Sequence, residues 1–85
     1  MTWLARVRVV LKPAVNDPQG LAIQGGLRHL GFAEVQTVRA GKLFEITLDA
    51  PDRETAARRV EEMCRRLLAN PVIEDFSFDV VEGGA

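Results

Sequence analysis

Trp3-Leu-Ala-Arg-Val-Arg-Val-Val-Leu-Lys12 is the stretch that decides the fold. Its odd positions are all apolar, whereas its even positions mix leucine and valine with arginine and lysine. Because successive side chains of a strand point to opposite faces, this alternation predicts a strand with one buried and one partly solvated face. The proline at position 13 ends it.

Two helices are predicted after this strand. Asn16-Asp17-Pro18 offers an N-cap followed by proline at the first helical position, and the helix runs to about Leu30 with Gly31 as its cap. Pro51-Asp52 opens the second helix, which ends at Asn70 because the following proline disfavours helical geometry there. Its apolar stripe recurs at helical spacing and comprises Ala56, Val60, Met63 and Leu67.

Three further strands are predicted from β-branched and aromatic residues. Phe32 to Asp49, divided by Ala40-Gly41-Lys42, predicts a hairpin whose first arm, Glu34 to Arg39, carries the weaker pattern. Val72 to Val81 predicts the last strand, and Glu82-Gly-Gly-Ala is expected to form a flexible tail.

The resulting order is β-α-β-β-α-β. It predicts an α+β, ferredoxin-like fold, with an antiparallel sheet and two helices on one face. In this plan the first strand lies between the third and the fourth. Arg6 and Arg8 would then lie on the open face near three acidic side chains, namely Glu45, Asp75 and Asp79.

Length and composition exclude several classes of protein. With 85 residues the chain predicts one domain, residues 1–85, and its net charge of −1 does not suit a nucleic-acid binder. The N-terminus contains no apolar stretch long enough for a signal peptide or a membrane span. A single cysteine cannot form a disulfide within the chain, and one cysteine with one histidine does not make a zinc site. A reducing, cytoplasmic location is therefore expected.

The sequence offers no convincing catalytic constellation. Cys64 falls on the apolar stripe of the second helix, which favours a small buried hydrophobe over a nucleophile. His29 lacks a partner nearby in sequence. The first helix contains Gly20, Gly25 and Gly26, which destabilise a helix, so these positions predict close packing on the sheet or contact with another chain.

Two polar loops are the better candidates for function. The connection from Lys12 to Gly20 and the segment from Val38 to Lys42 combine charges, amides, prolines and glycines, a composition suited to binding on a rigid scaffold. The open sheet face is half apolar, which favours a partner surface and predicts a homodimer or higher oligomer. The candidate partner-contact residues in these loops are Lys12, Asp17, Gln19, Arg39 and Lys42.

Four segments carry a resemblance to a known family: Lys12-Pro-x-Val-x-Asp-Pro-Gln-Gly20, Val38-Arg-x-Gly-Lys42, Val60-Glu-Glu-Met-Cys64 and Leu67-Leu-Ala-Asn-Pro-Val-Ile-Glu-Asp75. In this order and spacing they resemble PurS, the small subunit of phosphoribosylformylglycinamidine (FGAM) synthase in purine biosynthesis. The resemblance extends from about Val7 to Val81, and it adds Asn70 to the candidate partner-contact residues.

The resemblance implies an assembly subunit without an active site of its own. Such a chain bridges a PurQ-like glutaminase subunit and a PurL-like synthetase subunit, and assists ammonia transfer as FGAR, glutamine and ATP become FGAM. It implies no cofactor in this chain, since ATP and magnesium are used by the synthetase subunit.

An alternative remains open. Small regulatory modules that bind an amino acid at a dimer interface share the same order of elements, and fold alone does not separate the two classes. An independent enzyme ranks third, because the residues do not assemble a nucleophile with its base.

Overall fold

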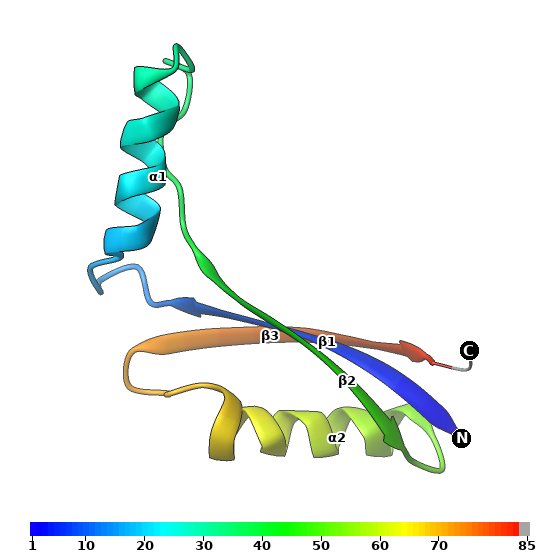
Figure 1. Cartoon of the computed structure of the whole chain (residues 1–85). Coiled ribbons are helices and arrows are strands. Elements are labelled where there is room, and N and C mark those ends of the chain that lie inside the picture. Colours follow the sequence, from blue (N-terminus) through cyan, green and yellow to red (C-terminus); the bar gives the residue numbers. More distant parts are fainter. Residues whose placement is uncertain (84–85) are drawn as a thin grey trace.

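The body of the molecule is a three-stranded antiparallel sheet with the order β2-β1-β3 (Figure 1). The computed structural model describes residues 1–83; its strands are β1 (Thr2–Leu11), β2 (Gly41–Asp49) and β3 (Glu74–Glu82). The central strand β1 pairs on both sides, with Val7 opposite Phe44 on β2 and Phe78 on β3. The predicted first strand therefore lies between the predicted third and fourth strands, as expected.

One face of this sheet carries the core. The odd residues of β1 point into it, and Ala5, Val7 and Val9 are fully buried. Helix α2 (Arg53–Met63) lies across this face and continues into the π-helical turn η1 (Cys64–Leu68), so the second helix ends at Leu68, two residues before the predicted end at Asn70. The carboxylate of Asp52 caps α2 by accepting a hydrogen bond of 2.7 Å from the Thr55 N–H.

The other face is open and carries ion pairs. Arg6 lies 3.3 Å from Glu45 and Arg8 lies 2.7 Å from Asp79, which confirms the predicted pairing of both arginines. Asp75 pairs with Lys12 instead, at 2.9 Å. These side chains are all roughly half exposed, so the pairs add little stability.

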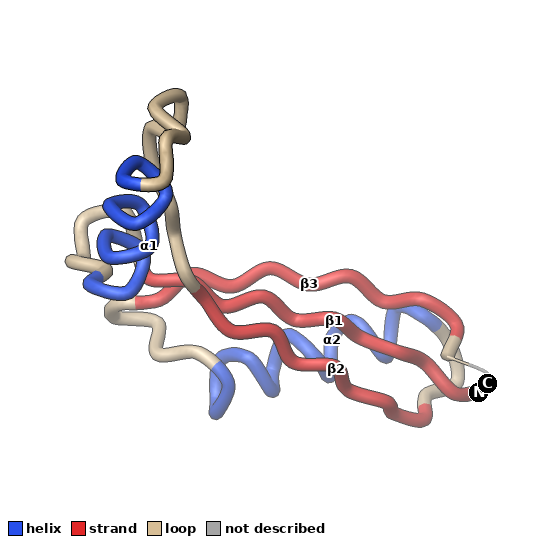
Figure 2. Tube along the Cα trace, turned by 45° about the horizontal axis from the view of Figure 1, so that its top comes forward, coloured by secondary structure: helices blue, strands red, loops and turns tan. Residues whose placement is uncertain are grey.

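Helix α1 (Pro18–His29) does not join α2 on the sheet; it projects away from it, as Figures 1 and 2 show. Its predicted start and end are confirmed, since Asp17 caps it and Gly31 adopts a φ of +103°. Only Gly20 of this helix is buried. The prediction of two helices on one face is therefore wrong for this chain taken alone, in which only α2 covers the sheet.

The predicted hairpin is also wrong. Glu34 to Arg39 forms no strand, and the expected turn at Ala40-Gly41-Lys42 is straight, because Gly41 and Lys42 already pair with Val10 and Val9 of β1. The chain thus runs directly from the tip of α1 into β2 (Figure 2). We call residues 18–40, which comprise α1 and this return segment, the arm.

The fold belongs to the α+β, ferredoxin-like class, but the projecting arm makes the molecule elongated. Its extents are 50 × 30 × 14 Å and its radius of gyration is 16.3 Å. A compact domain of this length has a radius of gyration of about 12 Å. At the C-terminus, β3 reaches Glu82 and the Gly83 N–H donates to the Thr2 carbonyl at 3.0 Å, so the sheet extends into the predicted tail. The rest of that tail, residues 84–85, lies outside the described residues.

Candidate interaction surface

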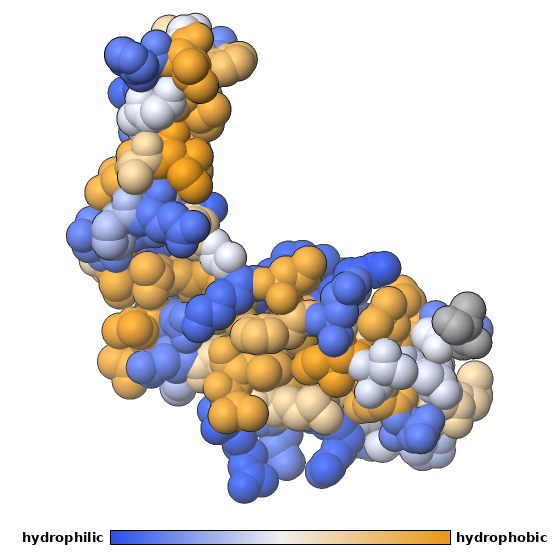
Figure 3. All heavy atoms as spheres, viewed as in Figure 1, coloured by the Kyte–Doolittle hydropathy of each residue, from blue (hydrophilic) through white to orange (hydrophobic). Residues whose placement is uncertain are grey.

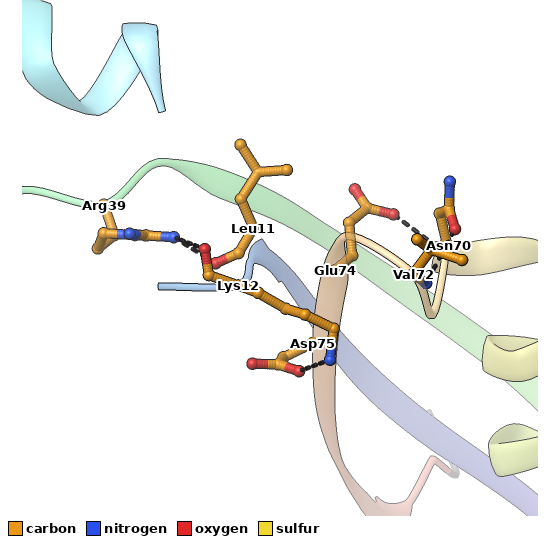
Figure 4. A network of polar contacts seen from close by, with 7 residues as sticks. All are labelled: Leu11, Lys12, Arg39, Asn70, Val72, Glu74 and Asp75. Atoms are coloured by element: carbon orange, nitrogen blue, oxygen red, sulfur yellow. Dashed lines mark hydrogen bonds and ion pairs between the residues drawn. The ribbon is translucent and has the colours of Figure 1, made fainter. Parts of the chain in front are cut away.

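The six candidate residues from the two loops and the shared motif gather at one end of the sheet, where β1 ends and β2 and β3 begin. Figure 4 shows three of them, Lys12, Arg39 and Asn70. Asp17, Gln19 and Lys42 line one hollow of 270 Å³. Lys12 and Asn70 reach the same end through contacts with the first residues of β3. We call this set the sheet-end cluster; it comprises Lys12, Asp17, Gln19, Arg39, Lys42 and Asn70, with Glu74 and Asp75 as their acidic partners.

Asp17 is the one buried charged residue among residues 1–83, with 7% of its surface exposed. One carboxylate oxygen accepts a hydrogen bond from the Gly20 N–H and the other accepts one from the Ala40 N–H, both at 3.0 Å. These two bonds, with a smaller contribution from the Arg39 guanidinium, hold the pKa of Asp17 below its usual value despite the opposing effect of burial. Asp17 thus joins the start of α1 to the start of β2.

Arg39 reaches back over the end of β1. Its guanidinium donates to the backbone carbonyls of Leu11 and, at 3.1 Å, Lys12 (Figure 4). Its Nε atom lies 3.9 Å from the Asp17 carboxylate. These contacts leave the Arg39 side chain only 37% exposed. Arg39 was predicted to contact a partner, but in this structure it contacts its own chain.

Glu74 connects the remaining members of the cluster. Its carboxylate accepts a hydrogen bond of 2.7 Å from the Asn70 N–H and lies 3.8 Å from the Lys42 ammonium group. The Asn70 side chain accepts a hydrogen bond of 3.0 Å from the Val72 N–H, an Asx-turn that orders the loop before β3 (Figure 4). The loop is therefore fixed, while the Lys42 side chain stays 63% exposed.

The six predicted contact residues did not include Glu74, Asp75 or Gly20, although all three stand in the segments that carry the resemblance. The sequence placed Asp75 near Arg6 and Arg8 and not near Lys12, because strand alternation gives the face of an acid but not the cation that it meets. Gly20 matters through its missing side chain: a Cβ there would lie 2.5 Å from the Val38 carbonyl oxygen and from the Asp17 carboxylate. That clash depends on residues far apart in sequence, so helix patterning does not predict it.

The arm exposes apolar side chains, and Figure 3 shows apolar atoms on the arm as well as on the body of the molecule. The exposed apolar residues of the arm are Leu21, Ile23, Leu30 and Phe32. Gly25 and Gly26 face open space, since a Cβ added at either one would have no neighbouring atom within 4 Å. The close packing on the sheet that these glycines could have served is therefore absent within the described chain.

A matching apolar surface lies on the sheet beside α2. The inner face of β2 buries none of its residues completely, and Phe44, Ile46 and Leu48 are only partly covered. A groove of 440 Å³ runs between this strand and the second helix, lined by Ile46, Met63, Leu67 and Leu68, with Arg59, Glu62 and Arg66 at its rim. It occupies the part of the sheet face that a second helix would cover in a complete ferredoxin-like fold.

The described residues contain no arrangement suited to nucleophilic catalysis or metal binding. Cys64 is fully buried, and this burial raises the pKa of its thiol, the opposite of what a nucleophile needs. His29 is exposed on the projecting helix. Across residues 1–83 no three His, Cys, Asp or Glu side chains come together to hold a metal ion, and no helix there is long and apolar enough to cross a membrane.

Comparison with known proteins connects this geometry to a family. Residues 4–82 match the family described as PurS, phosphoribosylformylglycinamidine (FGAM) synthase. The chain belongs to the PurS family. It is 49% identical to the PurS subunit of phosphoribosylformylglycinamidine synthase from Synechocystis sp. over 79 residues, which cover 93% of this chain and 79% of that one.

Solved PurS structures share its fold. PurS from Thermus thermophilus superposes with a TM-score of 0.87 at 36% identity, covering 96% of this chain and 98% of that one. A chain in the structure of PurLQS from Thermotoga maritima gives a TM-score of 0.87 at 28% identity, covering 95% of this chain and 99% of that one. This PurS chain is thus a subunit of FGAM synthase, a ligase complex of purine biosynthesis.

Proposed function

We propose that this PurS chain is a non-catalytic assembly subunit that bridges the glutaminase (PurQ-like) and ATP-dependent synthetase (PurL-like) subunits of cytoplasmic FGAM synthase and assists ammonia transfer between them. The observation that carries the proposal is the arm, which leaves the sheet and exposes apolar side chains over its length. An exposed apolar surface of this kind on a small chain is typical of an interface. ATP and magnesium belong to the synthetase subunit in this proposal.

A homodimer or higher oligomer is the second part of the proposal. The chain exposes 6036 Å². A folded monomer of 9.4 kDa is expected to expose about 5,000 Å². The excess of about 1,000 Å² is close to the roughly 800 Å² that each partner buries in a standard interface. The surplus surface is therefore what one stable interface per chain would cover.

The second copy is proposed to complete the sheet face. Its α1 would pack beside α2 over Phe44, Ile46 and Leu48, and its residues 34–39 would add to the free edge of β2. Both missing parts of the ferredoxin-like plan would then come from the partner copy, and the apolar residues of the arm would meet an apolar groove.

Reconstitution of the complex tests the bridging role. Purified chain alone should show neither glutaminase nor ATPase activity. Added to the synthetase and glutaminase subunits, it should raise glutamine-dependent FGAM formation and leave ammonia-dependent formation unchanged, because added ammonia bypasses transfer between subunits. Glutamate release by the pure chain that disappears in Cys64→Ala would contradict the non-catalytic assignment, and calorimetric binding of glutamine to the isolated chain would favour the regulatory module.

Lys42 provides a point variant for the same assay. Its side chain is mostly exposed and has only a 3.8 Å contact with Glu74, so Lys42→Ala should change the free energy of unfolding by no more than about 0.5 kcal/mol. If the sheet-end cluster faces another subunit, the variant lowers glutamine-dependent turnover at limiting concentrations of this chain. Arg58→Ala on α2, where Arg58 has only an exposed 3.5 Å pair with Glu54, is the matched control.

A further inference from the structure

Three parts of the chain meet at a single joint at the base of the arm. They are the end of β1, the start of α1 at Asp17, and residues 38–40 where the arm returns to β2. The Asp17 bond to Gly20 is an ordinary helix cap, but its bond to Ala40 spans 23 positions and ties the two ends of the arm together. The arm is therefore held at both of its ends by one buried carboxylate.

Arg39 fixes the direction in which the arm leaves. Its guanidinium holds the carbonyl oxygens of Leu11 and Lys12, the last residues before the chain turns away from β1. Gly20 leaves no space for the segment to slide, because even a Cβ at this position would collide with the Val38 carbonyl. The joint thus has one tightly packed arrangement.

The same segment has a second arrangement available by its local sequence. Residues 34–39 have strand-like composition and Ala40-Gly41-Lys42 suits a tight turn, so the segment could fold back along the free edge of β2 as a hairpin within one chain. In that closed form Arg39 would lie across the turn on the outer edge of β2. Its contacts with β1, and the Ala40 bond to Asp17, would all be broken.

We propose that Asp17 and Arg39 form a clamp that holds the arm open and so favours the form able to reach a second copy over the closed, self-contained monomer. The clamp rests on the proposed homo-oligomer for its purpose, but its effect on the arm is a property of the single chain. Asp17 and Arg39 are positioning residues in this view: they set the direction of a surface that other residues supply.

The first test removes Arg39 and, as a control, an arginine far from the joint. Arg39→Ala should raise the dissociation constant of the oligomer about tenfold or more, as measured by sedimentation over a range of concentrations. Arg58 lies on α2 and has only an exposed 3.5 Å pair with Glu54, so Arg58→Ala is the control and should change the dissociation constant less than about threefold. Arg39→Lys, which keeps the charge but loses the planar guanidinium, should lie between Arg39→Ala and the unaltered chain. Equal effects of Arg39→Ala and Arg58→Ala would overturn the clamp.

The second test reads the arm directly. Spin labels on cysteines introduced at the exposed positions Ala33 and Ser77, in a Cys64→Ala background diluted with unlabelled chain, report the distance within one chain. The unaltered joint should give one long distance, and Arg39→Ala or Asp17→Asn should add a shorter, closed population. An unchanged distribution in both variants, with far-ultraviolet circular dichroism also unchanged, would refute the clamp.

The two tests separate the clamp from the proposed function. If the unaltered chain sediments as a monomer at every concentration, the proposed oligomer is wrong, while the label distances still decide whether the clamp holds the arm open. If the chain forms an oligomer whose affinity and label distances are insensitive to both clamp residues, the clamp is wrong and the oligomer stands.

Discussion

Asp17 shows how one residue can serve local and long-range structure together. As an N-cap it satisfies the Gly20 N–H, a role that Asn, Ser or Thr could also fill. Its second oxygen is committed to the Ala40 N–H, and only a group that accepts hydrogen bonds on both oxygens satisfies the two amides at once. The local role was readable from Asn16-Asp17-Pro18, whereas the long-range role depends on a residue 23 positions away.

The ionisation of Asp17 gives a prediction at this scale. Because its pKa is lowered in the folded chain, its contribution to stability is present above the unfolded value of about 3.9 and is lost as the pH falls through the lower, folded value. Asp17→Asn keeps the cap to Gly20 but turns an amide N–H₂ toward Ala40. Its urea midpoint should therefore lie below that of the unaltered chain at neutral pH, and the gap should close in acid.

Asp52 supplies the control for this measurement. Its pKa is also lowered, chiefly by the hydrogen bond from the Thr55 N–H, but it caps α2 and makes no contact with the arm. With Asp52→Asn, the free energy of unfolding should fall less on acidification than it does in the unaltered chain. The distance between spin labels at positions 33 and 77 should stay unchanged. Parallel pH curves for the unaltered chain and Asp17→Asn would show that the Asp17 charge does not stabilise the fold.

At the scale of elements, the two helices differ in what their sequences could reveal. The stripe of α2 meets the buried face of the adjacent β1 and β3, so periodicity, Asp52 and the following proline predicted its extent and its covered side. The start and end of α1 were predicted equally well from Asp17 and Gly31. The position of α1 relative to the sheet was not predicted. Periodicity indicates which side of a helix is apolar, but it does not indicate whether the same chain or another molecule covers that side.

The hairpin failed for a related reason. Local composition favours a strand over residues 34–39 and a turn at Ala40-Gly41-Lys42, and both choices agree with a closed single-chain fold. The contacts that oppose closure come from Asp17 and from the carbonyls of Leu11 and Lys12, which no local pattern connects to Arg39. All six site candidates nevertheless lie at one end of the sheet, because β1 is antiparallel to β2 and β3, so that its end lies beside the starts of both neighbours.

The glycines of α1 give a prediction for this element. Gly20→Ala forces a Cβ against the Val38 carbonyl, so we expect a loss of about 1–3 kcal/mol in the free energy of unfolding, as in other overpacked sites. Gly25→Ala meets no atom within 4 Å and should stabilise the helix by about 0.5–1 kcal/mol. Urea titrations at dilute, monomeric concentrations measure both. Equal effects of the two substitutions would mean that the arm does not pack against residues 38–40.

At the scale of the whole molecule, the elongated shape and the incomplete sheet face have one common explanation. The chain carries an apolar arm that its own sheet does not use, and a groove beside α2 that its own arm does not fill. In the folded single chain both apolar surfaces stay exposed to water, so they contribute nothing to the free energy of folding. This matters for a chain of this size, because its core is small. Exchange of arms between two copies would bury both surfaces at once and requires no change in the direction that the clamp gives the arm.

Reciprocal exchange makes a prediction that simple association does not. Ile23→Asp places a charge on the arm and Ile46→Lys places one in the groove, so each variant alone spoils both of its interfaces and should sediment as a monomer. In an equal mixture, the unaltered arm of the Ile46→Lys chain meets the unaltered groove of the Ile23→Asp chain, which restores one full interface and sets Asp against Lys in the other. The mixture should therefore form a heterodimer, detectable by sedimentation and by pull-down of an untagged variant with a tagged one. A mixture that stays monomeric while each variant keeps native circular dichroism would mean that the arm of one copy does not occupy the groove of the other.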